Sequence, residues 1–256
     1  MSGALLQATM LDKSYGPIRV LRGVSLAIAP GESHVVIGPN GAGKTTLFKV
    51  LTGELYADRG QVLFQGADLT RMPAHQRVHR GFGRTFQVAK VFTKLSVQDN
   101  LRVALEAGAR RGNPFGRVPP ARAAAFDAAI AALLDDTGFA AQREAVAGTL
   151  AYGDRKRLEL AMVLALEPAV LFLDEPTAGM SAAERQASVR LLQQVKRRRG
   201  LAMLMTEHDM EVVFGLADRI SVLHHGELIA SGSPEEIRAD ARVQEVYLGD
   251  EGAGHA

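Results

Sequence analysis

Apolar residues form two kinds of pattern along the chain, continuous runs and the spacing of amphipathic helices. Each pattern predicts a different element. Four short runs are almost wholly apolar, which is typical of strands buried on both faces of a sheet. These runs are residues 34–37, 170–173, 203–205 and 220–223. The last three runs are separated by residues 181–198 and 209–216, which have the spacing of amphipathic helices. The alternation predicts an α/β fold with a mostly parallel sheet and helices on both sides of it.

Residues before this alternation predict a second set of elements. Residues 4–36 are expected to form short antiparallel β segments, because turn residues at 15–17 and 29–32 interrupt them. A further strand is expected at 61–64, and the polar residues 74–80 favour a short helix.

The stretch 95–166 interrupts the α/β pattern with helical segments. Ser96 is a predicted N-cap and Asp99, three residues later, completes a loose capping box. The expected helices are 96–109, 121–134 and 152–166, joined by an irregular Gly- and Pro-containing connection at 110–120. The predicted division is an α/β core of residues 1–94 and 167–232, an inserted α-helical subdomain of residues 95–166, and a C-terminal helix and tail of residues 233–256.

Composition narrows the class of protein only modestly. The 256 residues are 47% apolar and 23% charged, which suits one large or two modest folded domains. No stretch free of Asp, Glu, Lys and Arg exceeds about 11 residues, so no membrane-spanning helix is predicted. With no cysteine and no secretion signal at the N-terminus, a cytoplasmic location is expected. A net charge of +2 does not call for a nucleic-acid partner, and the basic residues 196–199 suit a helix that ends at Gly200.

Residues 38–45 form the most informative motif of the chain. They fill the pattern G-x-x-x-x-G-K-[ST] between the strand 34–37 and a predicted helix at 46–51. Glycines allow backbone N–H groups to turn inward, and with the positive end of the helix they form a cradle for phosphate. Lys44 is expected to reach the β- and γ-phosphates, and the Thr45 hydroxyl to hold Mg²⁺. The candidate ATP-binding residues here are Gly38, Pro39, Asn40, Gly41, Ala42, Gly43, Lys44, Thr45 and Thr46.

A second candidate site follows the strand 170–173. Asp174 and Glu175 come at the carboxyl end of this strand, where ligands bind in open α/β sheets. Asp174 is expected to bind Mg²⁺, and Glu175 to act as the general base that polarises the attacking water. Alternatively, the two acids only end a strand before a turn at Pro176. Together the two motifs predict a P-loop nucleoside triphosphatase.

Five further motifs occur along the chain in the order found in the ATP-binding-cassette (ABC) family. The chain resembles that family over nearly its whole length. The motifs are Tyr15, Gln87 within Arg84-Thr85-Phe86-Gln87, residues 150–154, residues 178–183, and His208. Taken singly, Tyr15 also suits a half-buried strand residue and His208 a solvated loop residue. The resemblance therefore depends on the order of the motifs and not on one of them.

The resemblance implies a role for each motif. Tyr15 would stack on adenine, and Gln87 would sense Mg²⁺ and the attacking water. His208 would contact the γ-phosphate, and residues 178–183 would touch a partner subunit. Residues 150–154 correspond to the signature segment of the family, which covers the ATP of the partner.

The signature segment departs from the common Leu-Ser-Gly-Gly-Gln form. Ala151 stands in the serine position, Tyr152 replaces the first glycine, and Asp154 replaces the glutamine. We expect Ala151 and Gly153 to contribute backbone N–H groups at a helix N-terminus in place of the missing hydroxyl. Asp154 is expected to face away from the triphosphate, toward Arg155 or Arg157.

The resemblance also implies a machine with several subunits. It would be a homodimer, or a heterodimer with a paralogous ATPase, bound at the cytoplasmic face of the inner membrane. Integral membrane permease subunits would dock beside Gln87, where Val91 and Phe92 are candidate contacts, although these two could equally pack inside the helical subdomain. A solute-binding protein would act indirectly, and no nucleic acid is expected.

Several stretches are similar to the ATPases of branched-chain amino-acid importers, whose relatives carry urea, amides and aromatic acids. These stretches are residues 46–53, 84–87, 150–153 and 245–249. A lipopolysaccharide-export ATPase is the first alternative, because residues 95–101 are similar to that subtype. Less favoured are a cassette ATPase of DNA repair or translation, and a kinase.

Overall fold

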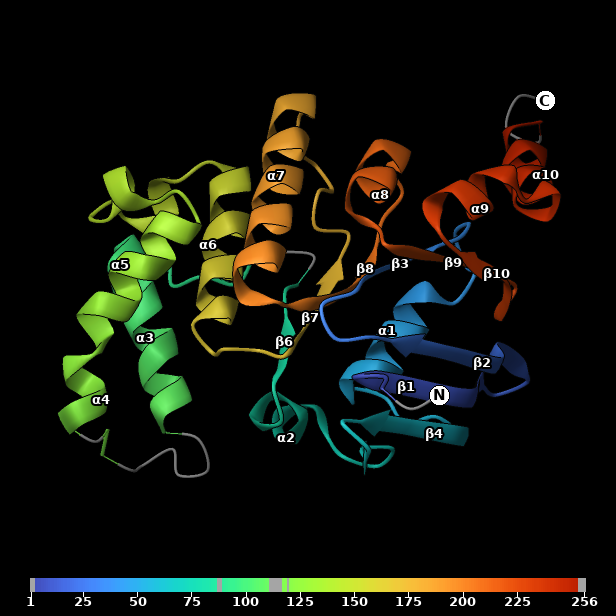
Figure 1. Ribbon diagram of the computed structural model, residues 1–256, viewed down its shortest axis with the longest axis horizontal. Coiled ribbons are helices and arrows are strands. Elements are labelled where there is room, and N and C mark those ends of the chain that lie inside the picture. The colour runs from blue at the N-terminus through green and yellow to red at the C-terminus, as the bar shows by residue number, and fades with distance from the viewer. Residues whose placement is uncertain (1–2, 87–88, 111–116, 119, 253–256) are drawn as a thin grey trace.

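The computed structural model describes residues 3–86, 89–110, 117–118 and 120–252, which form two sheets and several helices (Figure 1). The first sheet is antiparallel and has the strand order β2-β1-β4-β5. Its strands are β1 (Leu6–Tyr15), β2 (Ile18–Ile28), β4 (Arg59–Phe64) and β5 (Ala67–Asp68). The predicted antiparallel N-terminal segments are therefore present, but as two long strands and not as several short ones.

The second sheet has six strands in the order β10-β9-β3-β8-β7-β6. Its strands are β3 (Ser33–Ile37), β6 (Phe82–Arg84), β7 (Val170–Asp174), β8 (Ala202–Thr206), β9 (Arg219–His224) and β10 (Glu227–Gly232). All neighbours are parallel except β10, which pairs antiparallel with β9. The mostly parallel sheet and the α/β fold are thus confirmed.

Both faces of this sheet are buried, which is why its strands are continuous apolar runs. Alternate residues such as Val36, Phe172 and Leu204 face the first sheet and helix α1 (Lys44–Thr52). Their neighbours Leu171 and Met203 belong to the other core, which contains residues of the helices between 97 and 164 and of those after residue 181. Helix α1 therefore lies in a buried position between the two sheets.

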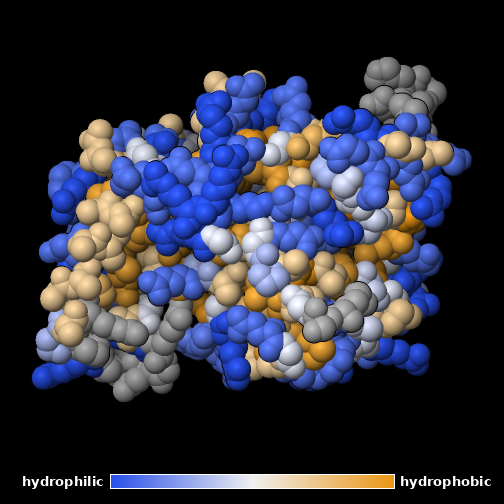
Figure 2. Space-filling view, viewed as in Figure 1, coloured by the Kyte–Doolittle hydropathy of each residue, from blue (hydrophilic) through white to orange (hydrophobic). Residues whose placement is uncertain are grey.

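The helices of the insert pack together, and we call α3 to α6 the helical subdomain. They are α3 (Val97–Ala109), α4 (Pro120–Ala124), α5 (Phe126–Asp136) and α6 (Tyr152–Leu164), with short 3-10 turns at Ala140–Gln142 and Ala147–Thr149. The Ser96 hydroxyl accepts a hydrogen bond from the Asp99 N–H, so the predicted cap is confirmed. The single helix expected over 121–134 is wrong, because the helical hydrogen bonding is interrupted at Ala125. Apolar atoms gather on the outer edge of α4 and α5 in Figure 2, where the exposed residues are mainly alanines.

The other helices connect or flank the strands. They are α2 (Ala74–His79), α7 (Ala182–Arg199), α8 (Met210–Leu216), α9 (Pro234–Ala239) and α10 (Ala241–Gly252). Helix α7 ends at Gly200 in the left-handed conformation, as predicted. In the region where a C-terminal helix and tail were expected, the described residues form two helices, α9 and α10, which meet at Asp240. In the described ranges no helix combines the length and apolar content needed to cross a bilayer.

One fully buried arginine fastens α2 to the end of α1. Arg77 donates hydrogen bonds to the carbonyl oxygens of Val50, Leu51, Leu69 and Met72. Two of these carbonyls belong to the last turn of α1, which leaves its acceptors without helical partners. Burial lowers the pKa of Arg77 to about 10, so the guanidinium remains charged at neutral pH.

Candidate nucleotide-binding and hydrolysis site

The phosphate loop joins the buried strand β3 to the first residue of α1. Gly38 has φ 155° and Gly43 has φ 108°. A Cβ atom on Gly38 would lie 2.1 Å from the carbonyl oxygen of Leu223, so a side chain cannot be placed there without moving β9. The glycine is needed for close packing of the loop on the sheet as well as for its backbone conformation.

The N-terminus of α1 is open to an anion. Among the described residues no side chain caps the helix, and its first turn contains no acidic residue. The first N–H groups of a helix have no partner within the helix and carry the positive end of its dipole. This arrangement suits a phosphate group. Thr45 is exposed and Thr46 half-buried at this end, so both candidate residues lie beside the open N–H groups.

Lys44 folds back onto the loop that precedes it. Its Nζ donates to the carbonyl oxygens of Gly38 and Pro39, at 2.5 and 3.0 Å. Burial lowers the pKa of Lys44, while the negative charges of Glu175 and Asp174 act in the opposite direction. The cation is thus held close to the phosphate loop and to both candidate acids.

The two acids lie at the carboxyl end of β7, beside the end of β8. Asp174 pairs in register with Thr206, whose hydroxyl donates to Asp174 Oδ1 at 2.8 Å. The Glu175 N–H donates to the Thr206 carbonyl oxygen at 3.1 Å. Glu175 has φ 48°, in the left-handed region that non-glycine residues seldom adopt. This conformation turns the chain directly after the strand and coincides with the predicted general base.

His208 meets Glu175 across the same sheet edge. The distance between His208 Nε2 and Glu175 Oε1 is 2.8 Å. The predicted residues Lys44, Asp174, Glu175 and His208 are therefore gathered at one edge, although they come from three separate stretches of the sequence. An imidazole bonded to a carboxylate can hold that carboxylate in place.

Other predicted residues lie apart from this cluster. Tyr15 ends β1 and is 47% exposed, as a residue that stacks on a base would need to be. Ala151 and Gly153 lie at the start of α6, and Figure 1 shows α6 well separated from α1. Gln87 lies outside the described residues.

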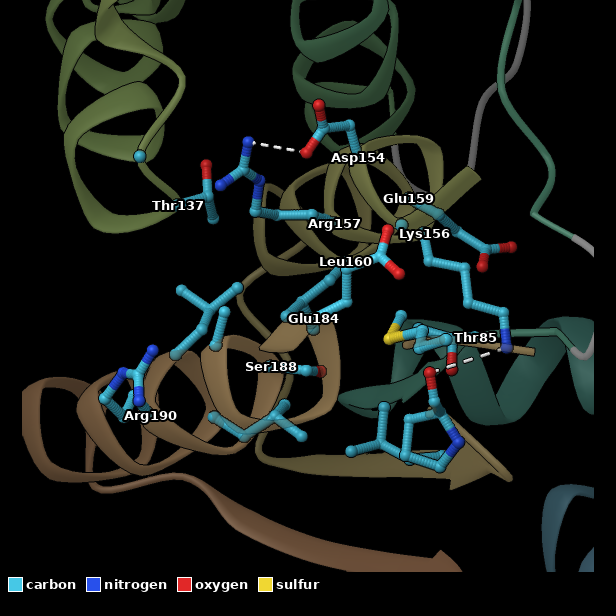
Figure 3. Close-up of a pocket in the computed structure, with 18 of the residues that line it drawn as sticks. Thr85, Thr137, Asp154, Lys156, Arg157, Glu159, Leu160, Glu184, Ser188 and Arg190 are labelled. Carbon is cyan, nitrogen blue, oxygen red and sulfur yellow. Dashed lines mark hydrogen bonds and ion pairs between the residues drawn. The ribbon is translucent and has the colours of Figure 1, made fainter. Parts of the chain in front are cut away.

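The structure shows which arginine the side chain of Asp154 faces in the signature segment. Asp154 Oδ1 accepts a hydrogen bond from Arg157 Nη2 at 2.8 Å, so Arg157 is the partner among the two expected arginines (Figure 3). Ala151 forms the N-cap position of α6 without a side-chain hydrogen bond. A Cβ on Gly153 would lie 3.0 Å from Glu184 Oε1, so this glycine packs closely on the first turn of α7.

Sequence reasoning missed residues that hold the candidate acids. Thr206 bonds to both Asp174 and the Glu175 backbone, as described above. Arg84 lies at the end of β6, forms an ion pair with Glu54, and has its Nη2 3.9 Å from Asp174 Oδ2. The register of the predicted parallel strands could have indicated Thr206. The position of Arg84 beside Asp174 could not be predicted, because it depends on β6, a strand that was not predicted.

A cavity of about 310 Å³ lies between the helical subdomain and α7 (Figure 3). Its lining comes mainly from α6, α7 and the loop that follows α5, and includes Glu159, Leu160 and Ser188. No residue of the phosphate loop contributes to that lining, as far as the structure describes the chain. The cavity is therefore distinct from the phosphate loop, and it separates the helical subdomain from α7.

The residues present suit Mg²⁺ bound together with a nucleotide. The described part of the chain holds no cluster of three or more His, Cys, Asp or Glu side chains that could bind a metal alone. Mg²⁺ does not require one, since it commonly keeps several waters and takes one or two carboxylates plus substrate phosphates. Asp174 and the exposed Thr45 are groups of the kind it uses.

Comparison with known proteins agrees with this geometry. Residues 21–178 match the ABC transporter family, and residues 227–253 match the family described as branched-chain amino acid ATP-binding cassette transporter. The chain is 37% identical to the lipopolysaccharide export system ATP-binding protein LptB of Acidithiobacillus ferridurans, covering 96% of this chain and 98% of that one. It is 36% identical to the high-affinity branched-chain amino acid transport ATP-binding protein LivG of Escherichia coli, covering 98% and 100%.

Solved structures show the same fold. The ADP conformation of MJ1267, an ATP-binding cassette of an ABC transporter, matches with a TM-score of 0.83 at 28% identity, covering 97% of this chain and 100% of that one. CbiO1 from Clostridium perfringens matches with a TM-score of 0.82 at 27% identity, covering 99% and 98%.

The chain belongs to the ABC transporter family, which confirms the resemblance drawn from its motifs. Within that family it is an ATP-hydrolysing subunit, since the matched region is the nucleotide-binding cassette.

Proposed function

We propose that two nucleotide sites form when this chain pairs head to tail with a second copy or with a paralogous ATPase. The support is that the phosphate loop and the signature segment lie apart in one chain, in the core and at the start of α6. A second chain would bring its signature over the ATP held by Lys44. Binding of ATP would then close the dimer, and loss of the γ-phosphate would open it.

Within each site, Glu175 is proposed as the general base, and His208 as the group that orients Glu175 and contacts the γ-phosphate. The hydrogen bond between His208 Nε2 and Glu175 Oε1 supports this pairing. Lys44 would leave its two carbonyl partners and bind the β- and γ-phosphates. Thr45, Asp174 and Gln87 would hold Mg²⁺, which neutralises charge on the phosphates.

Two substitutions test these roles. Glu175→Gln should bind ATP, stall hydrolysis and accumulate a dimer, which gel filtration with ATP would detect. Hydrolysis at the parental rate would refute the role of Glu175. Lys44→Ala should abolish ATP binding, measured with a fluorescent ATP analogue. Unchanged affinity for the analogue would remove the phosphate-loop proposal.

The transported solute is proposed to be a branched-chain amino acid, or a related small polar solute such as urea, an amide or an aromatic acid. The observation that carries this proposal is the match of residues 227–253, whose described part, 227–252, covers β10, α9 and α10. Overall sequence identity does not distinguish import from export, because the chain is 37% identical to the export protein LptB and 36% identical to the transport protein LivG. Lipopolysaccharide export therefore remains the second candidate.

Coupling to transport would require integral membrane permease subunits, to which the chain would bind at the cytoplasmic face of the inner membrane. Phe92 is 49% exposed and Phe86 is 37% exposed, so both could contact a permease beside the segment that carries Gln87. Val91 is only partly buried against the helical subdomain and could contribute at the edge. Residues 95–166 would then move as one body relative to the core of residues 1–94 and 167–232.

Transport in proteoliposomes tests the solute and the direction together. The chain would be purified with the membrane proteins that bind it and reconstituted with radiolabelled leucine and the matching solute-binding protein. ATP-dependent uptake that Glu175→Gln abolishes is the expected result. ATP-dependent extraction of lipopolysaccharide without leucine uptake would favour the export alternative.

A further inference from the structure

Helix α6 contacts the backbone of two catalytic segments through side chains on one of its faces. Lys156 Nζ donates to the carbonyl oxygens of Glu175 and Pro176, at 3.2 and 3.4 Å, and the second bond is drawn in Figure 3. Lys156 is only 7% exposed, so these contacts lie in the interior. The cation thus holds the turn that immediately follows the strand β7.

Glu159 makes the complementary contact one turn further along α6. Its Oε1 accepts hydrogen bonds from the N–H groups of Lys90, at 3.0 Å, and Phe86, at 3.4 Å. These two donors flank the position of Gln87 in the sequence. Since Glu159 and Lys156 are three residues apart on a helix, they lie on the same face, as Figure 3 shows.

The burial of Glu159 indicates that these contacts matter. The residue is 3% exposed, and burying an ionisable carboxyl is unfavourable unless hydrogen bonds compensate. Burial raises the pKa of the Glu159 carboxyl, and the hydrogen bonds from Lys90 and Phe86 oppose that rise. If Glu159 served only to fill space, an apolar residue would do so at a lower free-energy cost.

The chain changes its attachment from the core to the helical subdomain at this point. The Thr85 N–H donates to the Phe172 carbonyl oxygen at 3.1 Å and so extends the core sheet. The next N–H, of Phe86, bonds to Glu159. Further on, the Phe92 N–H and carbonyl oxygen both bond to the buried side chain of Asn100 on α3. Side chains of the helical subdomain therefore hold the backbone on both sides of Lys90.

We propose that Glu159 is a positioning residue that ties the segment carrying Gln87 to the helix whose first residues cover the nucleotide of the partner. The inference rests on the head-to-tail dimer proposed above. When Ala151 and Gly153 engage the partner's ATP, α6 would move as a unit. Glu159 and Lys156 would transmit this movement to the Gln87 segment and to Glu175, so that each copy aligns its own catalytic groups only when its partner is loaded.

Hydrolysis kinetics of the full-length chain test the proposal with matched variants. Glu159→Leu keeps the volume and removes the acceptor, whereas Glu159→Gln keeps one carbonyl oxygen at the position of Oε1. Met162→Ala on the same helix is the control for loss of packing, because Met162 packs against the core and makes none of these contacts. Should Glu159→Leu fail to fold, Glu159→Asp, which is one methylene shorter, takes its place.

For Glu159→Leu we expect kcat to fall by about tenfold or more, because small misplacement of catalytic groups has effects of this size. Its affinity for a fluorescent ATP analogue should stay within about twofold, because the phosphate loop is untouched, and the Hill coefficient for ATP should fall toward one. Glu159→Gln should recover kcat to within about threefold of the parent. Hydrogen exchange should rise in peptides covering 85–92 and stay unchanged across 44–52.

The proposal is overturned if Glu159→Leu keeps the parental kcat and cooperativity, or if Met162→Ala loses as much kcat at an equal change in thermal stability. It is also overturned if Glu159→Gln is no better than Glu159→Leu. Failure of the dimer proposal is distinguishable, since Glu175→Gln would then yield no ATP-dependent dimer and the parent no cooperativity.

Discussion

Replacement of Thr206 by valine should slow hydrolysis without changing the fold. Thr206 is 1% exposed, and valine has nearly the same shape, so the substitution removes little more than the hydroxyl. That hydroxyl donates to Asp174 Oδ1 at 2.8 Å and also lies 3.2 Å from the Glu175 N–H. A hydrogen bond to a charged group contributes about 1.5–3 kcal/mol. Loss of a residue that orients a metal ligand typically costs about 10–100-fold in affinity or activity.

The measurement is steady-state ATP hydrolysis as a function of Mg²⁺ concentration. We expect Thr206→Val to lower kcat by about 10–100-fold and to raise the Mg²⁺ concentration needed for half-maximal rate. Thr206→Ser keeps the hydroxyl and should stay within about threefold of the parent. Parental kcat and Mg²⁺ dependence in Thr206→Val, with the fold intact by circular dichroism, would show that Asp174 and Glu175 need no support from β8.

Three further substitutions probe the loop, the helical subdomain and the signature. Gly38→Ala should destabilise the protein by about 1–3 kcal/mol and weaken ATP binding, because the new Cβ would meet the Leu223 carbonyl oxygen. Gly41→Ala, which has open space at its Cβ, should cost less, and equal thermal stability of Gly38→Ala and the parent would contradict the packing argument. Burial opposes ionisation of Asp136, but hydrogen bonds from Arg199 and Arg198 outweigh it and lower its pKa, so Asp136→Asn should cost about 1 kcal/mol near pH 7. In urea titrations this difference should be complete above about pH 4 and disappear as the pH falls through the lowered pKa, so a difference independent of pH would refute the assignment. Asp154→Gln should be neutral or activating in ATP hydrolysis, and complete inactivation would show that the departure in the signature is essential.

The elements that the sequence predicted well are those with a strong local signal. Buried parallel strands are continuous apolar runs, so β7, β8 and β9 could be placed from hydrophobicity alone. The caps at Ser96 and Gly200 were predicted because capping is local chemistry. Such signals need no knowledge of the rest of the fold.

The elements that escaped prediction depend on partners that are distant in the chain. Strand β6 has three residues, Phe82 to Arg84, and it is a strand only because it pairs with β7. Strand β10 has only a short apolar run, Leu228 to Ala230, whose residues are partly buried, and it forms by antiparallel pairing with β9. Sequence periodicity cannot reveal an edge strand that is stabilised by one neighbour.

The residues of the candidate site also differ in whether local sequence could predict them. Lys44, Asp174 and Glu175 were found because their spacing to strands is part of a motif with a physical reason. His208 required the family resemblance, and its contact with Glu175 required the structure. Glu159 gave no signal, because a glutamate within a helix usually faces solvent and only tertiary packing buries it here.

The two carbonyl bonds of Lys44 also bear on substitutions at this position. The Lys44 Nζ donates to the carbonyl oxygens of Gly38 and Pro39, so the side chain links the first residue of α1 back to the start of the loop. A short neutral side chain would leave both oxygens without this donor. Loss of the lysine should therefore loosen the loop itself, in addition to removing a positive charge.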